Sequence, residues 1–535
     1  MPRIKRRGFL RAAVGCGLAF SAGGFEPRAG RAQTKAAAPA ELLIDPARTS
    51  ADLDRRLFGS FLEHIGRAIY GGIFEPGSKL ADESGFRRDV LDEIRGLEVP
   101  MVRYPGGNFV SGYNWLDGVG PRDKRPRVLE RAWNSIETNA FGTNEFIAWC
   151  RKVDSEPLLA VNLGTGTPET AAALVEYCNL EQGTRWSDLR RAHGAVQPHK
   201  VKHWCLGNEM DGPWQIGHMT AGEYGRKAAD AARQMRVVDR DIKLVACGSS
   251  GPFMPTYLEW DRQALEQCYN DVDAVSLHRY VNNTRDTDGK SERFIALNLS
   301  FEQQIDEVLG VCDLIRARLR SRKRLWLSFD EWNVWYREMQ LDGKQQVAPH
   351  LVEEVYNLED ALLVGGILNS LIRKAARVRI GCLAQLVNVI APLATNAERV
   401  LRQSIYFPYL WALKYARGKV LDLSVKSAGY DVPGVGPVPY IDAAATLEPE
   451  AGRLTCLILN RDLERERELS IVWRDSPPAR VLACQVLTGA DLKAFNTFEH
   501  PDRVSPRDLE PPRPAPRMPL VLPPRSYVLL HLSMT

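Results

Sequence analysis

The strongest constraint on the fold is a regular alternation of short β-forming runs with helical patterns between about residues 55 and 415. Eight runs are rich in β-forming residues, and they lie at 57–62, 100–104, 157–163, 201–206, 242–247, 274–278, 325–329 and 380–387. Their nearly continuous apolar character is typical of parallel strands that are covered on both faces. Eight such units over about 360 residues favour a (β/α)8 TIM barrel over a doubly wound sheet.

The pattern changes after about residue 418. Strand-like runs at 420–425, 453–459, 469–473, 480–487 and 527–532 are separated by turn-rich linkers, among them 433–437 and the proline-rich stretch 511–519. No helical period appears between them, so the sequence predicts an all-β sandwich of jelly-roll type at 419–535. The apolar residues 42–44 predict a strand from 40–51 that joins this sandwich from the other side of the barrel, which we place at 52–418.

The N-terminus has the pattern of an export signal. Residues 1–33 hold seven basic residues and one acidic residue, and 5–11 resembles the twin-arginine signal without the usual Ser or Thr before the arginine pair. An apolar stretch and a small-residue cleavage site at 30–32 follow. This pattern predicts a signal peptide at 1–33 and a periplasmic or secreted protein. The alternative is a cytoplasmic protein with a basic N-terminal segment.

Charge and residue usage exclude several partners. Beyond residue 33 there are 63 basic and 65 acidic residues, so we expect no nucleic-acid partner. The longest apolar run, 361–372, is too short for a span of about 20 residues, so no membrane anchor is expected once the signal is removed. The cysteines show no CxxC spacing and the histidines no HExxH, so we expect no zinc site, no other metal and no organic cofactor.

Polar residues collect where the predicted strands end, which is where TIM barrels hold their reactive groups. They are Glu63, His64, Arg103, Asn108, Asn208, Glu209, His278, Tyr280, Asp330, Glu331 and Gln385. A single glutamate at such a position is often a salt-bridge or capping residue, but three that converge with arginine and amides indicate a site. Paired carboxylates without a phosphate loop are typical of glycoside hydrolysis.

Two segments carry a resemblance to a known family. WCLGNEMDGPWQ at 204–215 and FDEWNVWY at 329–336 resemble the signatures of glycoside hydrolase family 51, the retaining α-L-arabinofuranosidases. Further similarity lies at 63–67, 103–108, 162–166, 276–280 and 384–388, and the resemblance covers roughly residues 52–532. The family's architecture, a catalytic barrel with a β-sandwich that takes a strand from before the barrel, matches the pattern above.

The resemblance implies roles for individual residues. Glu209, after the fourth strand, corresponds to the general acid/base, and Glu331, after the seventh, to the nucleophile. Residues implied to hold the sugar are Glu63, Arg103, Asn108, Asn208, Tyr280 and Gln385. We add His278, which can orient the acid or Tyr280, and Trp335 and Trp214 as aromatic walls. Retaining chemistry predicts carboxyl groups roughly 5 Å apart, with Glu209 kept protonated by the charge of Glu331.

We therefore expect a retaining, exo-acting α-L-arabinofuranosidase that removes terminal arabinose from plant arabinan, arabinoxylan or arabino-oligosaccharides. One alternative is another retaining barrel glycosidase, such as a xylosidase or an endoglucanase. Another is a carbohydrate-binding protein with a relic site, which the presence of both glutamates argues against. The sequence leaves open the preferred polysaccharide and whether the protein forms a homo-oligomer.

Overall fold

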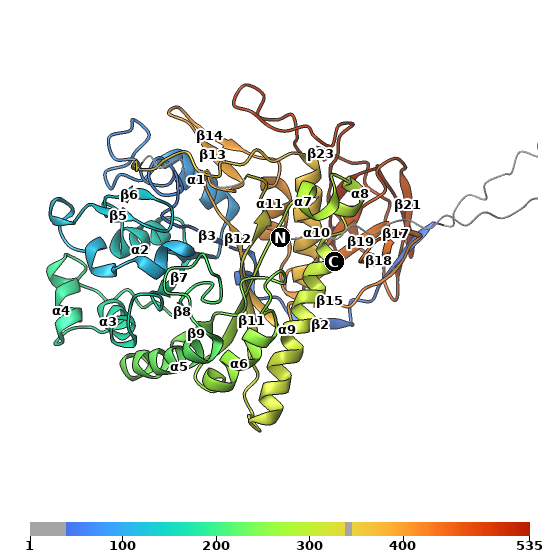
Figure 1. Cartoon of the computed structure of the whole chain (residues 1–535). Helices are drawn as coiled ribbons and strands as arrows, with labels where there is room; N and C mark the ends of the chain where they lie inside the picture. The colour runs from blue at the N-terminus through green and yellow to red at the C-terminus, as the bar shows by residue number, and fades with distance from the viewer. Residues whose placement is uncertain (1–38, 338–344) are drawn as a thin grey trace, which may run out of the picture. The chain divides into compact units, whose positions relative to one another are not determined.

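The computed structural model describes residues 39–337 and 345–535, so the predicted signal peptide at 1–33 lies outside the described residues. Its centre is a closed barrel of eight parallel strands (Figure 1). In barrel order these are β3 (Gly59–Phe61), β4 (Met101–Tyr104), β7 (Glu156–Val161), β8 (His203–Leu206), β9 (Lys243–Ala246), β10 (Ala274–Val281), β11 (Trp326–Val334) and β12 (Val378–Ala384). Each strand overlaps one predicted run, which confirms the TIM barrel.

Helices cover the outside of the barrel and bury their apolar faces against it. They are α1 (Arg88–Leu97), α2 (Thr143–Lys152), α3 (Pro168–Asn179), α4 (Arg185–Ala192), α5 (Ala221–Val238), α6 (Glu259–Cys268), α7 (Asn283–Thr287), α8 (Ser291–Phe294), α9 (Asn298–Arg318), α10 (Leu358–Arg373) and α11 (Tyr406–Tyr415). In α1, for example, Val90, Leu91, Ile94 and Leu97 are buried at helical spacing. After β4 the chain also forms a short hairpin of β5 (Val128–Glu130) and β6 (Ser135–Glu137).

Strand β11 contains one more residue than either neighbouring strand over the same stretch. Along β10, Ser276 lies opposite Ser328 but His278 lies opposite Glu331. The pairing with β12 slips by one residue over the same stretch, between Phe329 and Trp332. A bulge of this kind breaks the strict alternation of side chains between the two faces. It allows the consecutive residues Asp330 and Glu331 both to contact groups inside the barrel.

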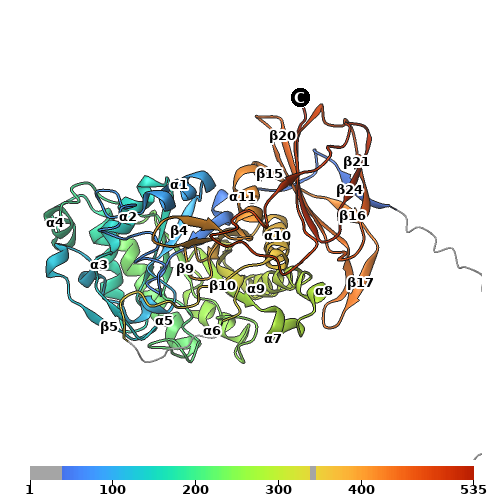
Figure 2. The same ribbon diagram turned by 90° about the horizontal axis from the view of Figure 1, so that it is seen from above.

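The C-terminal domain consists of two sheets. The larger has the order β2-β15-β19-β20-β25-β22-β23 and the smaller β16-β1-β21-β24. Their strands are β1 (Ala40–Ile44), β2 (Thr49–Asp52), β15 (Lys419–Leu421), β16 (Ser424–Lys426), β19 (Ile441–Glu448), β20 (Arg453–Asn460), β21 (Arg467–Trp473), β22 (Arg480–Leu487), β23 (Arg507–Asp508), β24 (Arg517–Leu522) and β25 (Ser526–Ser533). In Figure 2 the blue β1 segment lies among the red C-terminal strands.

Three features of this domain differ from the sequence prediction. The predicted run 420–425 is divided between β15 and β16, which belong to different sheets. Strand β19 was not predicted, because the small residues Asp442 to Ala445 lack the usual β-forming side chains. Strand β24 overlaps the predicted linker 511–519, and it tolerates Pro519 because it lies at the edge of its sheet.

The larger sheet is buried on both faces. Alternate residues of β20, such as Cys456 and Ile458, pack with residues of the smaller sheet to form the sandwich core. The intervening residues, such as Leu457 and Leu459, belong to the same hydrophobic cluster as the barrel and its helices. Helices α10 and α11 contact this face of the sheet. The sandwich is therefore joined to the barrel through a continuous apolar core.

A group of charges also lies at this junction, and we call Glu302, Arg373, Asp442 and Arg461 the interface cluster. Asp442 and Arg461 are buried, and Glu302 and Arg373 are half-buried. Asp442 accepts hydrogen bonds from Arg461 at 2.7 Å and from Arg373 at 3.1 Å. Arg373 also forms an ion pair with Glu302 at 2.5 Å. Burial opposes ionisation of Asp442, but the charges of Arg373 and Arg461 hold its pKa well below the usual range. The two cations and two anions neutralise one another.

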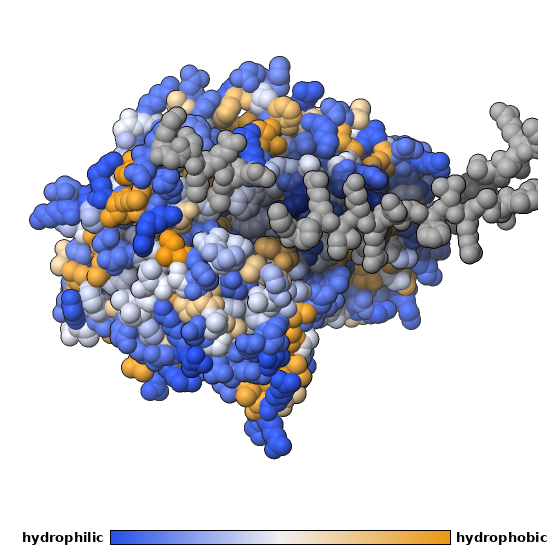
Figure 3. Space-filling view, in the orientation of Figure 1, coloured by the Kyte–Doolittle hydropathy of each residue, from blue (hydrophilic) through white to orange (hydrophobic). Residues whose placement is uncertain are grey.

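One face of the molecule (Figure 3) is mostly polar, and the described cysteines form no disulfide bonds. The face in Figure 3 is largely hydrophilic, with hydrophobic residues in small scattered groups. Among the described residues, no helix is long and apolar enough to cross a membrane. The nine cysteines from Cys150 to Cys484 are buried and unpaired.

Candidate active site

A pocket of about 450 Å³ lies at the carboxyl ends of the barrel strands. Seven of the predicted site residues line it: Glu63, Asn108, Glu209, Tyr280, Glu331, Trp335 and Gln385. The other three, Arg103, Asn208 and His278, are buried and contact the lining carboxylates directly or through one another. The structure thus brings together all ten residues singled out from the sequence.

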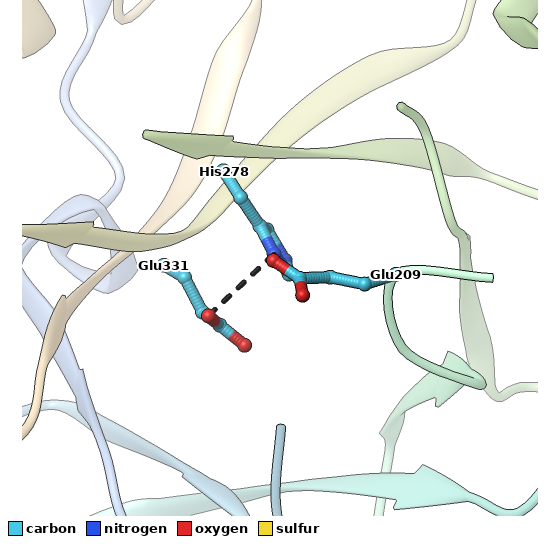
Figure 4. A group of neighbouring side chains, drawn as sticks. All are labelled: Glu209, His278 and Glu331. Atoms are coloured by element: carbon cyan, nitrogen blue, oxygen red, sulfur yellow. Dashed lines mark hydrogen bonds and ion pairs between the residues drawn. The ribbon is translucent and has the colours of Figure 1, made fainter. Parts of the chain in front are cut away.

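Glu209 and Glu331 face each other across the floor of this pocket, with His278 beside both (Figure 4). One oxygen from each carboxylate and one nitrogen of His278 all lie within 4.8 Å of one another. Carboxyl groups of retaining glycosidases are about 5–5.5 Å apart, whereas inverting enzymes need about 6.5–9.5 Å to admit a water molecule. The separation fits direct attack by one carboxylate on the sugar.

Glu331 is surrounded by hydrogen-bond donors. Arg103 of β4 donates to its Oε1 at 2.6 Å, and the Tyr280 hydroxyl donates to its Oε2 at 2.9 Å. The Nδ1 atom of His278 lies 3.5 Å from the same Oε2. Donors of this kind stabilise the ionised form of a carboxyl group, which is the form a nucleophile needs.

Glu209 has a different environment. It follows β8 with a φ of 46°, in the left-handed region, and this turn directs its side chain into the pocket. Trp214 Nε1 donates to its Oε2 at 2.7 Å, and His278 Nδ1 lies 3.0 Å from its Oε1. Burial, and then the charge of Glu331, raise the pKa of Glu209 although His278 opposes them. A raised pKa of Glu209 is what the sequence analysis expects, but the larger cause is burial and not the negative charge of Glu331.

Two amides extend the network beside the catalytic pair. Arg103 donates to the side-chain oxygen of Asn208 at 2.7 Å. Asn208 in turn donates from its amide nitrogen to Asn108 at 3.4 Å. Because these bonds fix the orientation of Asn208, its remaining amide hydrogen is available to a ligand next to Glu209.

Glu63 and Gln385 form the opposite side of the pocket. Oε1 of Glu63 accepts hydrogen bonds from the Phe109 backbone at 2.8 Å and from Trp133 Nε1 at 2.9 Å. Gln385 accepts from the Glu63 backbone at 3.0 Å. Burial raises the pKa of Glu63 to about 8 despite these bonds. A carboxyl group with a pKa raised in this way favours its protonated form, which can both donate and accept.

His278 has a carboxylate at each ring nitrogen. Nδ1 faces Glu209 and Glu331, and Nε2 lies 3.3 Å from Asp330 Oδ1. Burial alone lowers its pKa, but the charge of Glu331 and contacts with Asp330 and Glu209 raise it to about 10. The three side chains Glu209, His278 and Glu331 also resemble a metal-ligand set. The contacts of both ring nitrogens with carboxylates favour a protonated ring in the arrangement seen here.

Aromatic residues form much of the remaining wall. Trp335 packs edge-on against Tyr280 with ring centres 5.1 Å apart, and Trp214 packs against Phe253 at 6.1 Å. Trp133 and Phe253 were not predicted from the sequence. Trp133 lies in the β5–β6 turn and Phe253 in the loop after β9, and neither loop has a periodic pattern. Asp330 was noted at its strand end but was given no role.

Comparisons with known proteins agree with this geometry. Family models described as the α-L-arabinofuranosidase 1 domain and the α-L-arabinofuranosidase C-terminal domain match residues 93–296 and 330–526. The intracellular exo-α-(1→5)-L-arabinofuranosidase 1 of Bacillus subtilis is 48% identical over 85% of this chain and 91% of its own length. A family 51 α-L-arabinofuranosidase structure from Bifidobacterium longum has a TM-score of 0.88 at 38% identity, covering 92% of this chain and 99% of that one.

These relatives overturn the predicted location. The Bacillus subtilis enzyme and similar enzymes from Acetivibrio thermocellus and Streptomyces lividans are named intracellular. The expectation of a periplasmic or secreted protein, with twin-arginine export, is therefore wrong. A short basic segment with an arginine pair is a weak signal, because it is recognised by a receptor rather than fixed by folding, and here it lacks the usual Ser or Thr.

Both family models match this chain, the Bacillus subtilis enzyme is 48% identical to it, and the Bifidobacterium longum structure shares its fold. The chain belongs to glycoside hydrolase family 51, the α-L-arabinofuranosidases.

Proposed function

We propose that this protein is a retaining, exo-acting α-L-arabinofuranosidase that hydrolyses terminal non-reducing α-L-arabinofuranosyl residues. The observation that carries the proposal is the pair of carboxylates within 4.8 Å of each other in the pocket, one surrounded by donors and the other with a raised pKa. The names of the relatives support the sugar and the exo mode of action. We assign catalysis to the barrel at 52–418 and regard 419–535, with the strand from 40–51, as its structural partner.

In the first step Glu331 attacks the anomeric carbon, and the bond from that carbon to the leaving oxygen breaks. Glu209 gives its proton to that oxygen, so the leaving group departs as an alcohol. In the second step Glu209, now ionised, takes a proton from water, and the water oxygen displaces Glu331 from the anomeric carbon. Two inversions give net retention. Burial of Glu209 serves this sequence because it keeps the acid protonated until the leaving group needs the proton.

The remaining side chains would bind the terminal sugar. Arg103 and Tyr280 hold Glu331 in position for attack, and Asn208 is placed to bond the hydroxyl next to the anomeric centre, where interactions strengthen as positive charge develops. Glu63, Asn108 and Gln385 present donors and acceptors to the other hydroxyl groups. Trp335 provides an apolar wall that can pack against a sugar face.

We propose arabino-oligosaccharides as the substrates, with action inside the cell, because four relatives are named intracellular exo-α-(1→5)-L-arabinofuranosidases. A relative from Bifidobacterium longum is named an exo-α-(1→6)-L-arabinofuranosidase. The linkage is therefore best determined by comparing release of arabinose from α-(1→5)- and α-(1→6)-linked substrates.

The stereochemistry of the reaction tests the mechanism. The enzyme is given an aryl α-L-arabinofuranoside in the presence of methanol, and the methyl arabinofuranoside formed, which as an acetal does not mutarotate, is analysed by proton NMR. Retention predicts the methyl α-anomer. The methyl β-anomer would contradict the two-step mechanism, and absence of any arabinose release, with xylose or glucose released from matching aryl glycosides, would favour another glycosidase of the same fold.

A further inference from the structure

Asp330 is a buried carboxylate below the catalytic pair for which the proposed reaction has no use. Its side chain is 0% exposed. Oδ2 accepts a hydrogen bond from the Cys205 thiol at 3.4 Å and lies 3.5 Å from Arg103 Nε. Oδ1 lies 3.3 Å from Nε2 of His278. Asp330 Oδ1 and His278 Nε2 make no hydrogen bond within the described part of the chain, so their contact is an ion pair when the ring is protonated.

The orientation of His278 has a chemical consequence. A neutral imidazole has a single N–H and cannot donate from both nitrogens. Here Nε2 faces Asp330 while Nδ1 faces Glu209 at 3.0 Å and Glu331 at 3.5 Å. Asp330 beside Nε2 and Glu331 beside Nδ1 are both ionised in the proposed resting state, so a ring that lost either proton would turn a lone pair toward a negative charge. The arrangement therefore favours the doubly protonated ring. The β11 bulge makes this possible, because it lets Asp330 and Glu331 approach His278 from one strand.

The negative charge of the catalytic pair moves during the proposed cycle. Before the first step the charge is on Glu331 and Glu209 carries a proton. After it, Glu331 is an uncharged ester and Glu209 is ionised. The Nδ1–H of His278 is within reach of both carboxylates. A fixed imidazolium at this point can therefore stabilise the charge on either side of the step without rearrangement.

We propose that Asp330 is a positioning residue that holds His278 as an imidazolium between the two catalytic glutamates, so that one N–H serves both half-reactions. The proposal rests on the proposed function for its account of the cycle. The groups that face His278 or lie directly behind these partners are Glu209, Asp330, Glu331, Arg103, Tyr280 and Cys205. The raised pKa of His278, about 10, agrees with this arrangement.

The test compares Asp330→Asn, which keeps the shape but removes the charge, with Cys205→Ala, which removes the neighbouring thiol but keeps the charge. The wild-type pH profile of kcat/KM should be a bell, with ionisation of the pair Glu331 and Glu209 on its two sides. In Asp330→Asn we expect His278 to become neutral. Because the nearer positive charge is lost, both limbs of the bell should move to higher pH by about one unit or more. Cys205→Ala should leave the bell in place.

A second readout, which does not use activity, keeps the proposal falsifiable. Nitrogen-15 NMR of the imidazole rings, with the His278 signal assigned by its loss in His278→Gln, should show His278 protonated above pH 8 in the wild type and neutral there in Asp330→Asn. This measurement does not depend on turnover, so it remains valid if the proposed function fails. A bell that stays in place or moves to lower pH in a folded Asp330→Asn variant, or a wild-type His278 that is neutral at pH 8, would overturn the proposal.

Discussion

The protein contains two buried charge clusters that differ in how completely their charges are compensated. In the interface cluster, two arginines face two carboxylates, and the oxygens of Asp442 also accept hydrogen bonds from Asn369 and Asn298. In the pocket, three carboxyl groups, Glu209, Asp330 and Glu331, share one arginine and one histidine. A fourth, Glu63, accepts hydrogen bonds from neutral donors, the Phe109 backbone and the Trp133 indole.

The pKa values follow this difference. The pKa of Asp442 is held far below the usual range, whereas those of Glu63 and Glu209 are raised. A fully compensated cluster fixes one charge state and stabilises the junction of two domains. A cluster with excess acid keeps protons that it can release, which is what an acid/base catalyst requires. We therefore expect mutations in the pocket to lower activity more than stability, and mutations in the interface cluster to lower stability more than activity.

The largest effect on activity is expected for Glu331→Ala. Without the nucleophile neither an activated nor a natural substrate can begin the two-step reaction, so kcat should fall by at least about 10⁴-fold on both. Stability should change far less, because Arg103 keeps Asp330 and Asn208 as partners. Steady-state kinetics and thermal unfolding measure the two quantities. A variant that retains activity on either substrate would remove Glu331 from its assigned role.

Glu209→Ala should have an effect that depends on the leaving group. A sugar alkoxide needs a proton to depart, so cleavage of natural arabinosides should fall by about 10²- to 10⁴-fold. An aryl group with electron-withdrawing substituents leaves unaided, so formation of the glycosyl enzyme should be spared. Azide, which needs no general base, should restore turnover by displacing Glu331 from the glycosyl enzyme, and this second inversion gives the α-arabinosyl azide. Equal losses on both substrates, or exchange of the two patterns between Glu209 and Glu331, would show that the roles are assigned incorrectly.

Asp442→Asn should affect stability and leave catalysis unchanged. It removes the carboxylate that the buried Arg461 shares with the half-buried Arg373. Because Arg373 keeps Glu302, the cost should be about 3 kcal/mol, the lower end of the range for a broken buried pair. Because the folded-state pKa of Asp442 is depressed, the stability that it contributes is present at neutral pH and is lost as pH falls below the unfolded pKa of about 3.9. Denaturant unfolding of variant and wild type should therefore differ most at neutral pH. A lower kcat in the folded variant would mean that the clusters are coupled.

Among these pocket variants, Glu63→Gln should have the smallest effect on activity. If Glu63 acts as a neutral acid, the amide replaces it closely, and kcat/KM at pH 6 should stay within about threefold, or about 0.6 kcal/mol. Its raised folded-state pKa means that wild-type stability falls between the unfolded value near 4.3 and about pH 8. Glutamine does not titrate, so the Glu63→Gln variant should not lose stability in this range. The difference in unfolding free energy between variant and wild type should therefore grow, in favour of the variant, from pH 5 to pH 8. A loss of activity as large as that of Glu63→Ala would show that the ionised form is required.

The barrel and the carboxylates of the pocket could be found from the sequence because both follow from local patterns. Buried parallel strands are continuous apolar runs, and reactive groups lie just beyond them, so Glu209 and Glu331 could be found by position alone. The predicted ends of the strands were less accurate than the predicted order of the strands. β10 and β11 continue to Val281 and Val334, so His278, Tyr280 and Glu331 lie within strands rather than after them.

The missed features depend on contacts between distant segments. Trp133 reaches Glu63 from a hairpin 70 residues away, and no local pattern indicates this. The role of Asp330 depends on a bulge, because strict alternation would point either it or Glu331 away from the site. Strand β24 begins in a proline-rich stretch that reads as a linker until pairing with β21 is known. In each case tertiary pairing overrides the local preference of the sequence.

The most direct test of the central claim is to trap the intermediate. The Glu209→Ala variant is mixed with an activated aryl arabinofuranoside, its intact mass is measured within seconds, and the peptides are then sequenced by mass spectrometry. The account predicts a mass increase of one arabinosyl group, attached to Glu331 and removed by azide. An unmodified enzyme that still releases the aryl alcohol, or a label on any other residue, would contradict it.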